Sequence, residues 1–295
     1  MSKTYKLILT TLVASFAVFL LVMQVPRFGI LLLLIPGIYI WLGFSLPTQV
    51  SYVVGSVFFI GTTLLVVHPL GMMIGLFGAL IPIMMTLVAK RDYLEDIITK
   101  TVVMGYVGLL ATQYYLLKIY QIDLYELYLG SLRTLITQWQ ATGIDTTGTF
   151  NSLSNSYLSF LFILATAMAL GLYAIANFLR KLNLIRWQVQ PFYTFKFRGL
   201  NWLQFGIVLL LFYLLRVLDP PYQVVGENGI QFVMVLFAIQ GLSVASFYLK
   251  TRNVSRFVSM IILGFTLIMP LLNTMISLLG FSDSLFDFRK LEVMK

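Results

Sequence analysis

The feature that most constrains this chain is a series of long apolar segments, with the charged residues largely confined to the short stretches between them. Hydrophobic residues make up 59% of the 295 residues and charged residues only 11%, whereas soluble domains carry about a quarter charged residues. A fold surrounded by water cannot bury that much apolar surface. We therefore expect an all-α integral membrane protein, a polytopic helical bundle forming a single membrane domain over residues 1–295.

Nine segments are long enough to cross a bilayer as helices. A helix rises about 1.5 Å per residue, so a hydrocarbon core of about 30 Å takes roughly 17 to 25 apolar residues. The predicted spans are residues 7–23, 28–46, 51–67, 72–89, 101–119, 157–179, 200–218, 230–249 and 257–280. Pro36 and Gly37 lie inside the second segment, so eight spans result if residues 7–46 enclose one re-entrant element.

The basic residues predict the orientation. Lys and Arg beside membrane spans favour the cytoplasmic side. With the N-terminus in the cytoplasm, most of the 20 Lys and Arg residues fall in cytoplasmic connections. The net charge of +9 is spread over short clusters rather than one basic face, so we expect no nucleic-acid partner.

The longest polar interruption is the segment from 121 to 156. Its first part is predicted to be an amphipathic helix lying on the membrane or capping the bundle. The apolar face of that helix is expected at Leu124, Tyr128, Leu132, Leu135 and Trp139. Residues 141–156 are predicted to form a turn-rich loop, either a solvated connector or a lid.

Three groups of residues are candidates for contacts. Small residues at helical spacing predict helix packing or docking of a membrane partner, at Gly71, Gly75, Ala79, Ala165, Ala169 and Gly171. The 180–198 segment holds five cations and no acid, which predicts contact with lipid headgroups or a partner through Arg180, Lys181, Arg186, Lys196 and Arg198. In the tail, Asp283, Asp287, Arg289 and Lys290 are expected to pair at the membrane surface.

Residues for chemistry or for holding a cofactor are scarce. The chain has no cysteine, and its one histidine, His68, precedes a proline, so we expect no metal, no cofactor and no enzymatic activity. No glycine-rich phosphate loop is present, so ATP hydrolysis would need a separate protein. The eleven Asp and Glu residues all fall in connections, span ends or the tail, which argues against a pump with a buried carboxylate.

Three segments carry a resemblance to a known family. They are 197–202 (FRGLNW), 240–244 (QGLSV) and 279–290 (LGFSDSLFDFRK), the last of which contains Gly280, Asp283, Asp287, Arg289 and Lys290. With the order of spans, they resemble the YybS-like family of uncharacterised bacterial membrane proteins. The resemblance implies a multi-pass protein of the bacterial cytoplasmic membrane.

That family is distantly similar, in its N-terminal part, to the S components of energy-coupling-factor transporters. The similarity implies an S-component-like bundle over residues 1–180, followed by three further spans and a short tail over 181–295. S components dock a coupling subunit through Ala-x-x-x-Ala in their first span. Here Ala14 and Ala17 are three apart, which departs from that pattern.

Two functions follow as hypotheses. The first is a non-enzymatic subunit that binds a solute for transport with separate ATPase partners, and it predicts a cavity beneath residues 121–156. The alternative is a structural scaffold of the cell envelope, which predicts a tightly packed bundle. Membrane lipids are expected partners in both cases, with other membrane proteins or a coupling and ATPase module beside them; the sequence does not indicate an oligomeric state.

Overall fold

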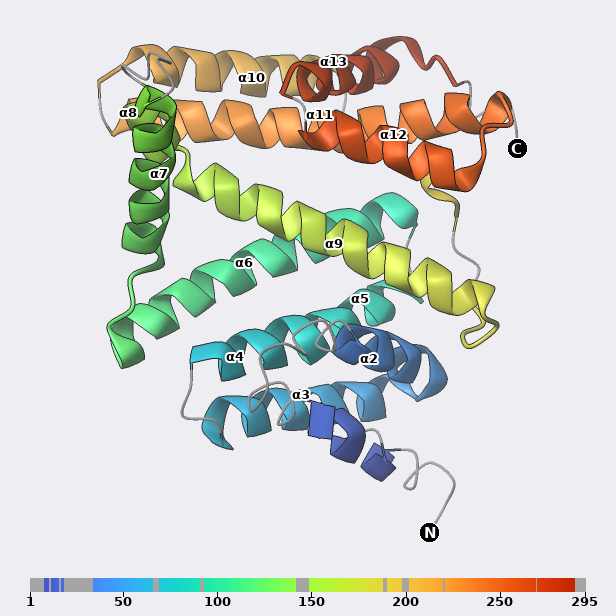
Figure 1. Cartoon of the computed structure of the whole chain (residues 1–295). Helices are drawn as coiled ribbons and strands as arrows, with labels where there is room; N and C mark the ends of the chain where they lie inside the picture. Colours follow the sequence, from blue (N-terminus) through green and yellow to red (C-terminus); the bar gives the residue numbers. More distant parts are fainter. Residues whose placement is uncertain are drawn as a thin grey trace. The chain divides into compact units, whose positions relative to one another are not determined.

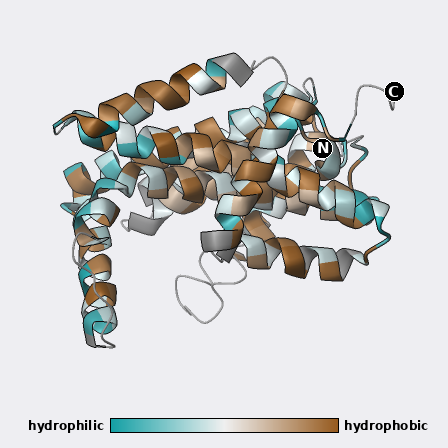
Figure 2. Cartoon of the chain, turned by 90° about the horizontal axis from the view of Figure 1, so that it is seen from above, coloured by the Kyte–Doolittle hydropathy of each residue, from teal (hydrophilic) through white to brown (hydrophobic). Residues whose placement is uncertain are grey.

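The computed structural model describes residues 8–10, 12–15, 17–18, 34–65, 69–90, 93–141, 149–187, 190–197, 202–219, 221–268 and 270–289. Within these ranges every regular element is a helix (Figure 1), which confirms the predicted all-α fold. In Figure 2 much of the helical ribbon is coloured as hydrophobic. The elements are α2 (Leu34–Ser45), α3 (Thr48–Leu65), α4 (Pro69–Gly75), the π-helical turn η2 (Leu76–Leu80), α5 (Ile81–Ala89), α6 (Leu94–Tyr120), α7 (Leu124–Ala141), α8 (Thr149–Asn155), α9 (Tyr157–Lys181), the short 3₁₀ turn η3 (Phe192–Thr194), α10 (Trp202–Val217), α11 (Tyr222–Thr251), α12 (Arg256–Ile268) and α13 (Pro270–Phe286).

Four helices in the described ranges are long and apolar enough to cross a membrane. They are the continuous helix Gly71–Ala89, which joins the end of α4 to η2 and α5, and the helices α6, α9 and α11. Two further apolar helices, α2 and the Gln204–Val217 part of α10, are shorter. The prediction of nine spans is therefore not supported.

The difference arises because an apolar run does not reveal where the helix within it begins and ends. In the described part of the predicted span 28–46, α2 has only 12 residues. The predicted span 257–280 is divided between α12, which ends at Ile268, and α13, which begins at Pro270. Proline lacks a backbone N–H and fits the first turn of a helix, so it favours a new start there. Of the predicted span 7–23, residues 8–10, 12–15 and 17–18 are described, and the rest lies outside the described residues.

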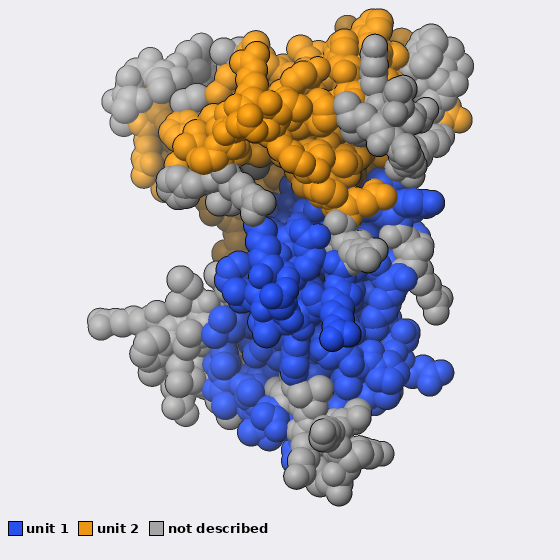
Figure 3. Space-filling view, turned by 90° about the vertical axis from the view of Figure 1, so that its right-hand side faces the viewer, with its two compact units in different colours: residues 1–124, 164–189 blue, residues 125–163, 190–295 orange. Residues whose placement is uncertain are grey.

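The chain divides into two compact units (Figure 3). Unit 1 comprises Met1–Leu124 and Leu164–Val189, and unit 2 comprises Tyr125–Ile163 and Gln190–Lys295. The S-component-like bundle was predicted to end near residue 180. In the division into compact units, the chain passes from unit 1 to unit 2 after Val189. Residues 125–163, which include α7 and α8, are grouped with unit 2.

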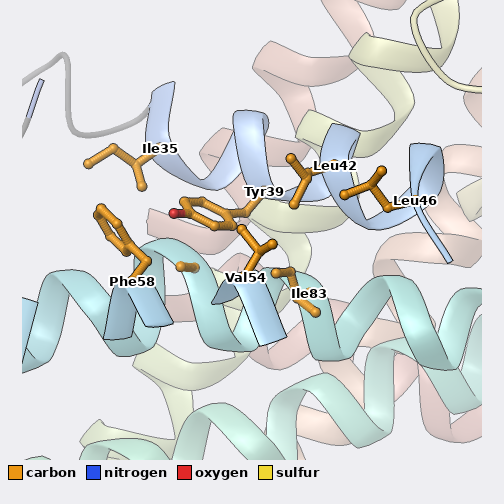
Figure 4. Close-up of a cluster of buried hydrophobic side chains, with 8 residues drawn as sticks. Ile35, Tyr39, Leu42, Leu46, Val54, Phe58 and Ile83 are labelled. Atoms are coloured by element: carbon orange, nitrogen blue, oxygen red, sulfur yellow. The ribbon is translucent and has the colours of Figure 1, made fainter. Parts of the chain in front are cut away.

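Unit 1 has an apolar core between α2, α3 and the helix Gly71–Ala89. Figure 4 shows the side chains of this core pointing toward one another, and all are buried: Ile35, Tyr39, Leu42, Leu46, Val54, Phe58 and Ile83. The Tyr39 and Phe58 rings lie 5.1 Å apart between centroids. Between helices in a membrane such a cluster stabilises the unit through close van der Waals packing rather than through transfer of side chains out of water.

The amphipathic helix predicted after residue 121 is confirmed as α7, but its buried face differs from the expected one. Leu129, Leu132 and Ile136 are the buried residues of this helix, whereas Leu135 is 45% and Trp139 is 39% exposed. The buried positions recur at three and four residues, which is one face of a helix. Of the expected apolar face, Leu132 is buried within the chain, whereas Leu135 and Trp139 stay exposed. In the loop predicted over 141–156, residues 149–155 form helix α8.

Unit 2 is arranged around α11, the longest described helix. Along α11, α10 packs near the first turns and α13 near the middle. Phe205 of α10, Phe237 of α11 and Phe281 of α13 form one aromatic cluster, with Phe237 4.8 Å from Phe205 and 5.1 Å from Phe281 between ring centroids. This cluster adjoins the polar site described next.

Candidate functional site

The candidate site is a buried ion pair in unit 2. Arg289 lies beside Asp283, with Nη2 2.7 Å from Oδ2 and Nε 3.3 Å from Oδ1, and both side chains are 0% exposed. Asp283 belongs to the last turn of α13, which ends at Phe286. Asp287 then adopts a left-handed φ of 46° and donates its N–H to the carbonyl of Asp283. This turn ends the helix and brings Arg289 back to Asp283.

Arg289 uses all the donors of its guanidinium, which has five N–H groups. Two of these bind the carboxylate of Asp283. Nη2 also donates to the carbonyl of Phe195 at 2.9 Å. Nη1 donates to the carbonyl of Tyr193 at 2.9 Å and to the hydroxyl of Ser243 at 2.7 Å. The cation therefore has one charged partner and three neutral ones.

Gln240 of α11 connects three segments of the chain. Its Nε2 donates to Asp283 Oδ2 at 3.1 Å and to Ser284 Oγ at 2.9 Å. Its Oε1 accepts the backbone N–H of Phe197 at 3.4 Å. Because the side chain of Gln240 is 0% exposed, both ends of this amide need partners, and both have them.

The third component is the irregular segment 190–197, which precedes α10. Within it, the N–H groups of Thr194 and Phe195 bind the carbonyls of Pro191 and Phe192. Ser243 Oγ lies 2.8 Å from the carbonyl oxygen of Phe192 and 2.9 Å from that of Phe195. Backbone groups that leave regular structure in a buried place need such partners, because an unpaired group costs about 1–3 kcal/mol. Side chains of α11 and the tail therefore satisfy the backbone of 190–197.

Two glycines allow α11 and α13 to meet beside this site. A Cβ atom at Gly241 would lie 1.9 Å from the carbonyl oxygen of Ile276. A Cβ atom at Gly280 would lie 2.0 Å from the carbonyl oxygen of Phe237. No larger residue fits at either position without moving the backbone. Gln240 precedes Gly241 by one residue and Asp283 follows Gly280 by three, so the close crossing places Gln240 opposite Asp283.

Two further cation contacts, less buried than the Asp283–Arg289 pair, surround it. Lys196 Nζ lies 2.9 Å from Asp287 Oδ1, with the side chains 21% and 33% exposed. Lys250 lies over the ring of Tyr193, 3.7 Å from its centroid, and also contacts the Tyr193 hydroxyl. Both contacts attach segment 190–197 to α11 or to the residues after α13. We refer to the set of Asp283, Arg289, Gln240 and Ser243, with the segment 190–197 that they bind, as the C-terminal clamp.

One family matches nearly the whole chain. Its description is "Predicted membrane protein (DUF2232)", and the match covers residues 13–284. The chain belongs to this family. No curated protein and no solved structure is similar enough to count as a match. Helices α2 to α12, α13 except its last two residues, and three of the four clamp residues fall within the matched range of this DUF2232 protein, while Arg289 follows it.

The clamp is organised for structure rather than for reaction. Moving a charged side chain out of water costs several kcal/mol, and the cost is offset only when partner and hydrogen bonds are complete. Here the cation and the carboxylate neutralise each other, the carboxylate also accepts from Gln240, and Arg289 also donates to two backbone carbonyls. Among the described residues, no group of three or more His, Asp or Glu side chains is placed to hold a metal ion.

The structure corrects the expectation for the tail of this DUF2232 protein. Asp283 and Arg289 were expected to pair at the surface, yet they are buried, and the carboxylate lies inside unit 2 rather than at an exposed helix end. The reason is that Arg289 donates to the backbone carbonyls of Tyr193 and Phe195 inside unit 2, which the residue types alone do not reveal. Asp287 pairs with Lys196. Gly280 lies at the helix crossing, and Lys290 lies outside the described residues.

Two members of the clamp had only an indirect signal in the sequence. Gln240 and Ser243 are polar residues three apart in the otherwise apolar stretch 232–245 of α11, so they share one face of that helix. The carbonyls of Tyr193 and Phe195 had no signal, because every residue carries a carbonyl group.

The six small residues predicted for packing or docking take different places. Gly71, Gly75, Ala79, Ala165 and Ala169 are buried. A Cβ atom at Gly75 would lie 3.0 Å from the Cα of Phe59 in α3, and one at Gly105 would lie 3.4 Å from the Cβ of Ala165. Gly171 is exposed, with open space where a Cβ atom would be. Five of the six therefore lie inside the chain's own packing, and Gly171 faces outward.

The basic residues also separate into groups. Lys196 is paired with Asp287 in the clamp, and Arg198 lies outside the described residues. Arg180, in the last turn of α9, is half-buried. Lys181 and Arg186 are exposed. Among the described basic residues of the predicted contact segment, Lys181 and Arg186 are the exposed ones.

Proposed function

We propose that this DUF2232 protein is a non-enzymatic subunit of the bacterial cytoplasmic membrane that binds a solute for transport together with separate ATPase partners. The observation that carries the proposal is the compactness of unit 1, which contains most of the region that resembles an S component. A solute-binding subunit must hold its ligand within one bundle. The cavity predicted beneath residues 121–156 stays a prediction.

The non-enzymatic part of the proposal is supported by the use of the buried polar groups. A general acid or base needs a group that can exchange a proton with a substrate. Asp283 instead accepts hydrogen bonds from Arg289 and Gln240, and Arg289 spends its donors on Asp283, Ser243 and two backbone carbonyls. These residues stabilise the fold of unit 2.

The proposed orientation is supported by the basic residues at one end of unit 1. Lys90 follows α5, and the indole N–H of Trp187 donates to the carbonyl of Ala89 at 3.3 Å, so the connection after α9 lies beside the end of α5. Lys181 and Arg186 belong to that connection. Cations at one end of a membrane bundle favour the cytoplasm. We propose that this end lies on the cytoplasmic side.

The test is purification of the tagged full chain from its native membrane in mild detergent, followed by mass spectrometry of proteins and small molecules. We expect a transmembrane coupling subunit and ATPases in stoichiometric amounts, together with a retained small molecule. Recovery of the chain without any ATPase module, at equal depth of detection, would overturn the transport proposal.

A matched pair of variants tests whether α9 docks the coupling subunit at Gly171, the exposed one of its predicted small residues. Gly171→Leu and Gly206→Leu both add a side chain where a Cβ atom meets nothing within 4 Å, one on α9 and one on α10. We expect Gly171→Leu to reduce the recovery of partners and Gly206→Leu to leave it unchanged. Equal recovery with both variants would place the docking surface elsewhere.

A scaffold in the cell envelope is the second candidate, and α7 favours it. This helix keeps Leu127 59%, Leu135 45% and Trp139 39% exposed. Apolar residues that stay exposed on an amphipathic helix suit contact with a membrane surface or another protein. In the same purification, recovery of envelope proteins that is lost with Leu127→Ser/Leu135→Ser, without ATPases, would support the scaffold.

A further inference from the structure

The connection that follows α9 begins with a left-handed turn. Asn183 has a φ of 57°, and its N–H donates to the carbonyl of Arg180 at 3.0 Å. The N–H of Leu184 donates to the carbonyl of Leu179, also at 3.0 Å. This pair of hydrogen bonds is the Schellman arrangement, which fixes the direction of the chain after a helix. Residues 181–186 therefore have a defined conformation.

The connection is also attached to unit 1 at its far end. Ile185 and Trp187 are buried, 5% and 8% exposed. The ring of Trp187 stacks on Phe44 with centroids 5.0 Å apart and meets Tyr173 edge-on at 6.4 Å. With Ile185 and Trp187 inside, the residues between α9 and Trp187 are held at the surface.

What this connection exposes is a mixture of leucine and positive charge. Leu182 and Leu184 are each 51% exposed, and Lys181 and Arg186 on either side of them are exposed as well. No acidic residue occurs anywhere between Leu164 and Trp187. Two exposed leucines between two cations match the boundary of a bilayer, where acyl chains meet charged headgroups.

The end of α11 provides an internal comparison. It has the same turn: Asn253 has a φ of 56° and donates to Lys250, while Val254 donates to Leu249. Its exposed residues are Thr251, Arg252 and Asn253. The same backbone thus carries leucines after α9 and polar residues after α11, so the turn itself does not require exposed leucine.

We infer that residues 181–186 bind anionic phospholipid at the membrane surface. Leu182 and Leu184 insert among the acyl chains, and Lys181 and Arg186 contact the phosphates. Helix α9 has 25 residues, roughly 37 Å at about 1.5 Å per residue, which exceeds a hydrocarbon core of about 30 Å. Its end therefore reaches the headgroups. The inference requires only that α9 spans the membrane, and it holds or fails independently of transport.

The absence of cysteine from the chain allows the test to use single labelling sites. Leu184→Cys and the matched control Arg252→Cys, each in the full chain, would carry a fluorophore in vesicles of phosphatidylcholine with increasing phosphatidylglycerol. Phosphatidylglycerol bearing a doxyl group serves as the quencher. We expect strong quenching at position 184 and weak quenching at position 252.

Charge is tested by adding Lys181→Ala or Arg186→Ala to the Leu184→Cys chain. Each substitution should raise the fraction of phosphatidylglycerol needed for half quenching by about fivefold. A label at 184 that is quenched no more than the label at 252 would overturn insertion. If doxyl-labelled phosphatidylcholine quenched the label at 184 as strongly as doxyl-labelled phosphatidylglycerol does, and neither Lys181→Ala nor Arg186→Ala changed this, recognition of the anionic lipid would be overturned. A label at 184 that is shielded in native membranes but open in vesicles would assign the surface to a protein partner and overturn the inference.

Discussion

Substitution of Arg289 by methionine is the sharpest test of the C-terminal clamp. Methionine keeps much of the side-chain volume but removes every hydrogen bond of the guanidinium. Asp283 is left buried with no opposite charge, the carbonyl of Tyr193 loses its donor, and the carbonyl of Phe195 keeps only Ser243 Oγ. Breaking a buried pair in this way costs about 3–5 kcal/mol. We expect the free energy of unfolding of Arg289→Met to fall by that amount.

The assay is unfolding of the purified chain in mixed detergent micelles, followed by the fluorescence of its 4 tryptophans. The double variant Asp283→Asn/Arg289→Met removes the orphaned charge, so it should be more stable than Arg289→Met alone. Lys196→Met is the matched control, because it breaks the neighbouring pair with Asp287, which is partly exposed. That control should cost only about 0–1 kcal/mol.

Two results would refute the reasoning. If Arg289→Met and Lys196→Met destabilised the chain equally, burial of the first pair would have no energetic consequence. If the double variant lost as much stability as Asp283→Asn and Arg289→Met do when their separate losses are added, Asp283 and Arg289 would not be coupled.

Three further predictions concern unit 2. Gly241→Ala should destabilise the chain by about 2–3 kcal/mol, because the added methyl group meets a carbonyl of α13. The control Gly206→Ala adds its methyl group in open space, so it should be neutral or stabilise the chain by up to about 1 kcal/mol. Thermal unfolding of both variants measures the difference. Asn228→Ala should cost about 1–3 kcal/mol by the same measurement, because the buried amide binds Ser159 and the carbonyl of Asn155. Burial raises the pKa of Tyr128, with the neighbouring Tyr125 adding to the effect, so the folded state holds this proton more tightly than the unfolded state. The contribution of Tyr128 to the free energy of unfolding is present below about pH 10 and is lost as the pH rises through the folded pKa. Between pH 8 and 11 the free energy of unfolding should therefore fall less in Tyr128→Phe than in the wild type.

The sequence predicted the class of fold because burial in a membrane leaves a strong compositional signal. Long apolar helices such as α6, α9 and α11 were found nearly at their observed positions. The number of spans was not predicted correctly, because hydropathy averages over a window and does not detect the point where a helix stops. Pro270 was such a point, and it lay inside a segment that was predicted to be one span.

The site was predicted in its parts and not in its arrangement. Segments 240–244 and 279–290 carried the family resemblance, and the structure joins them through Gln240, Ser243 and Asp283. Charged residues near a chain end usually indicate a solvated surface, so burial of Asp283 and Arg289 was missed. The decisive partners are backbone carbonyls 94 and 96 residues away in the sequence from Arg289. Such long-range contacts leave no periodic pattern.

The clamp explains why a chain with few charges places two of them inside unit 2. Segment 190–197 is irregular apart from the 3₁₀ turn η3, so its carbonyls must find donors elsewhere. Arginine suits this role better than lysine because its five donors lie in one plane and reach several acceptors at once. The carboxylate of Asp283 then balances the charge that this solution introduces. The ion pair is thus a consequence of the irregular backbone, and the close crossing of α11 and α13 at their glycines is what brings its partners within reach.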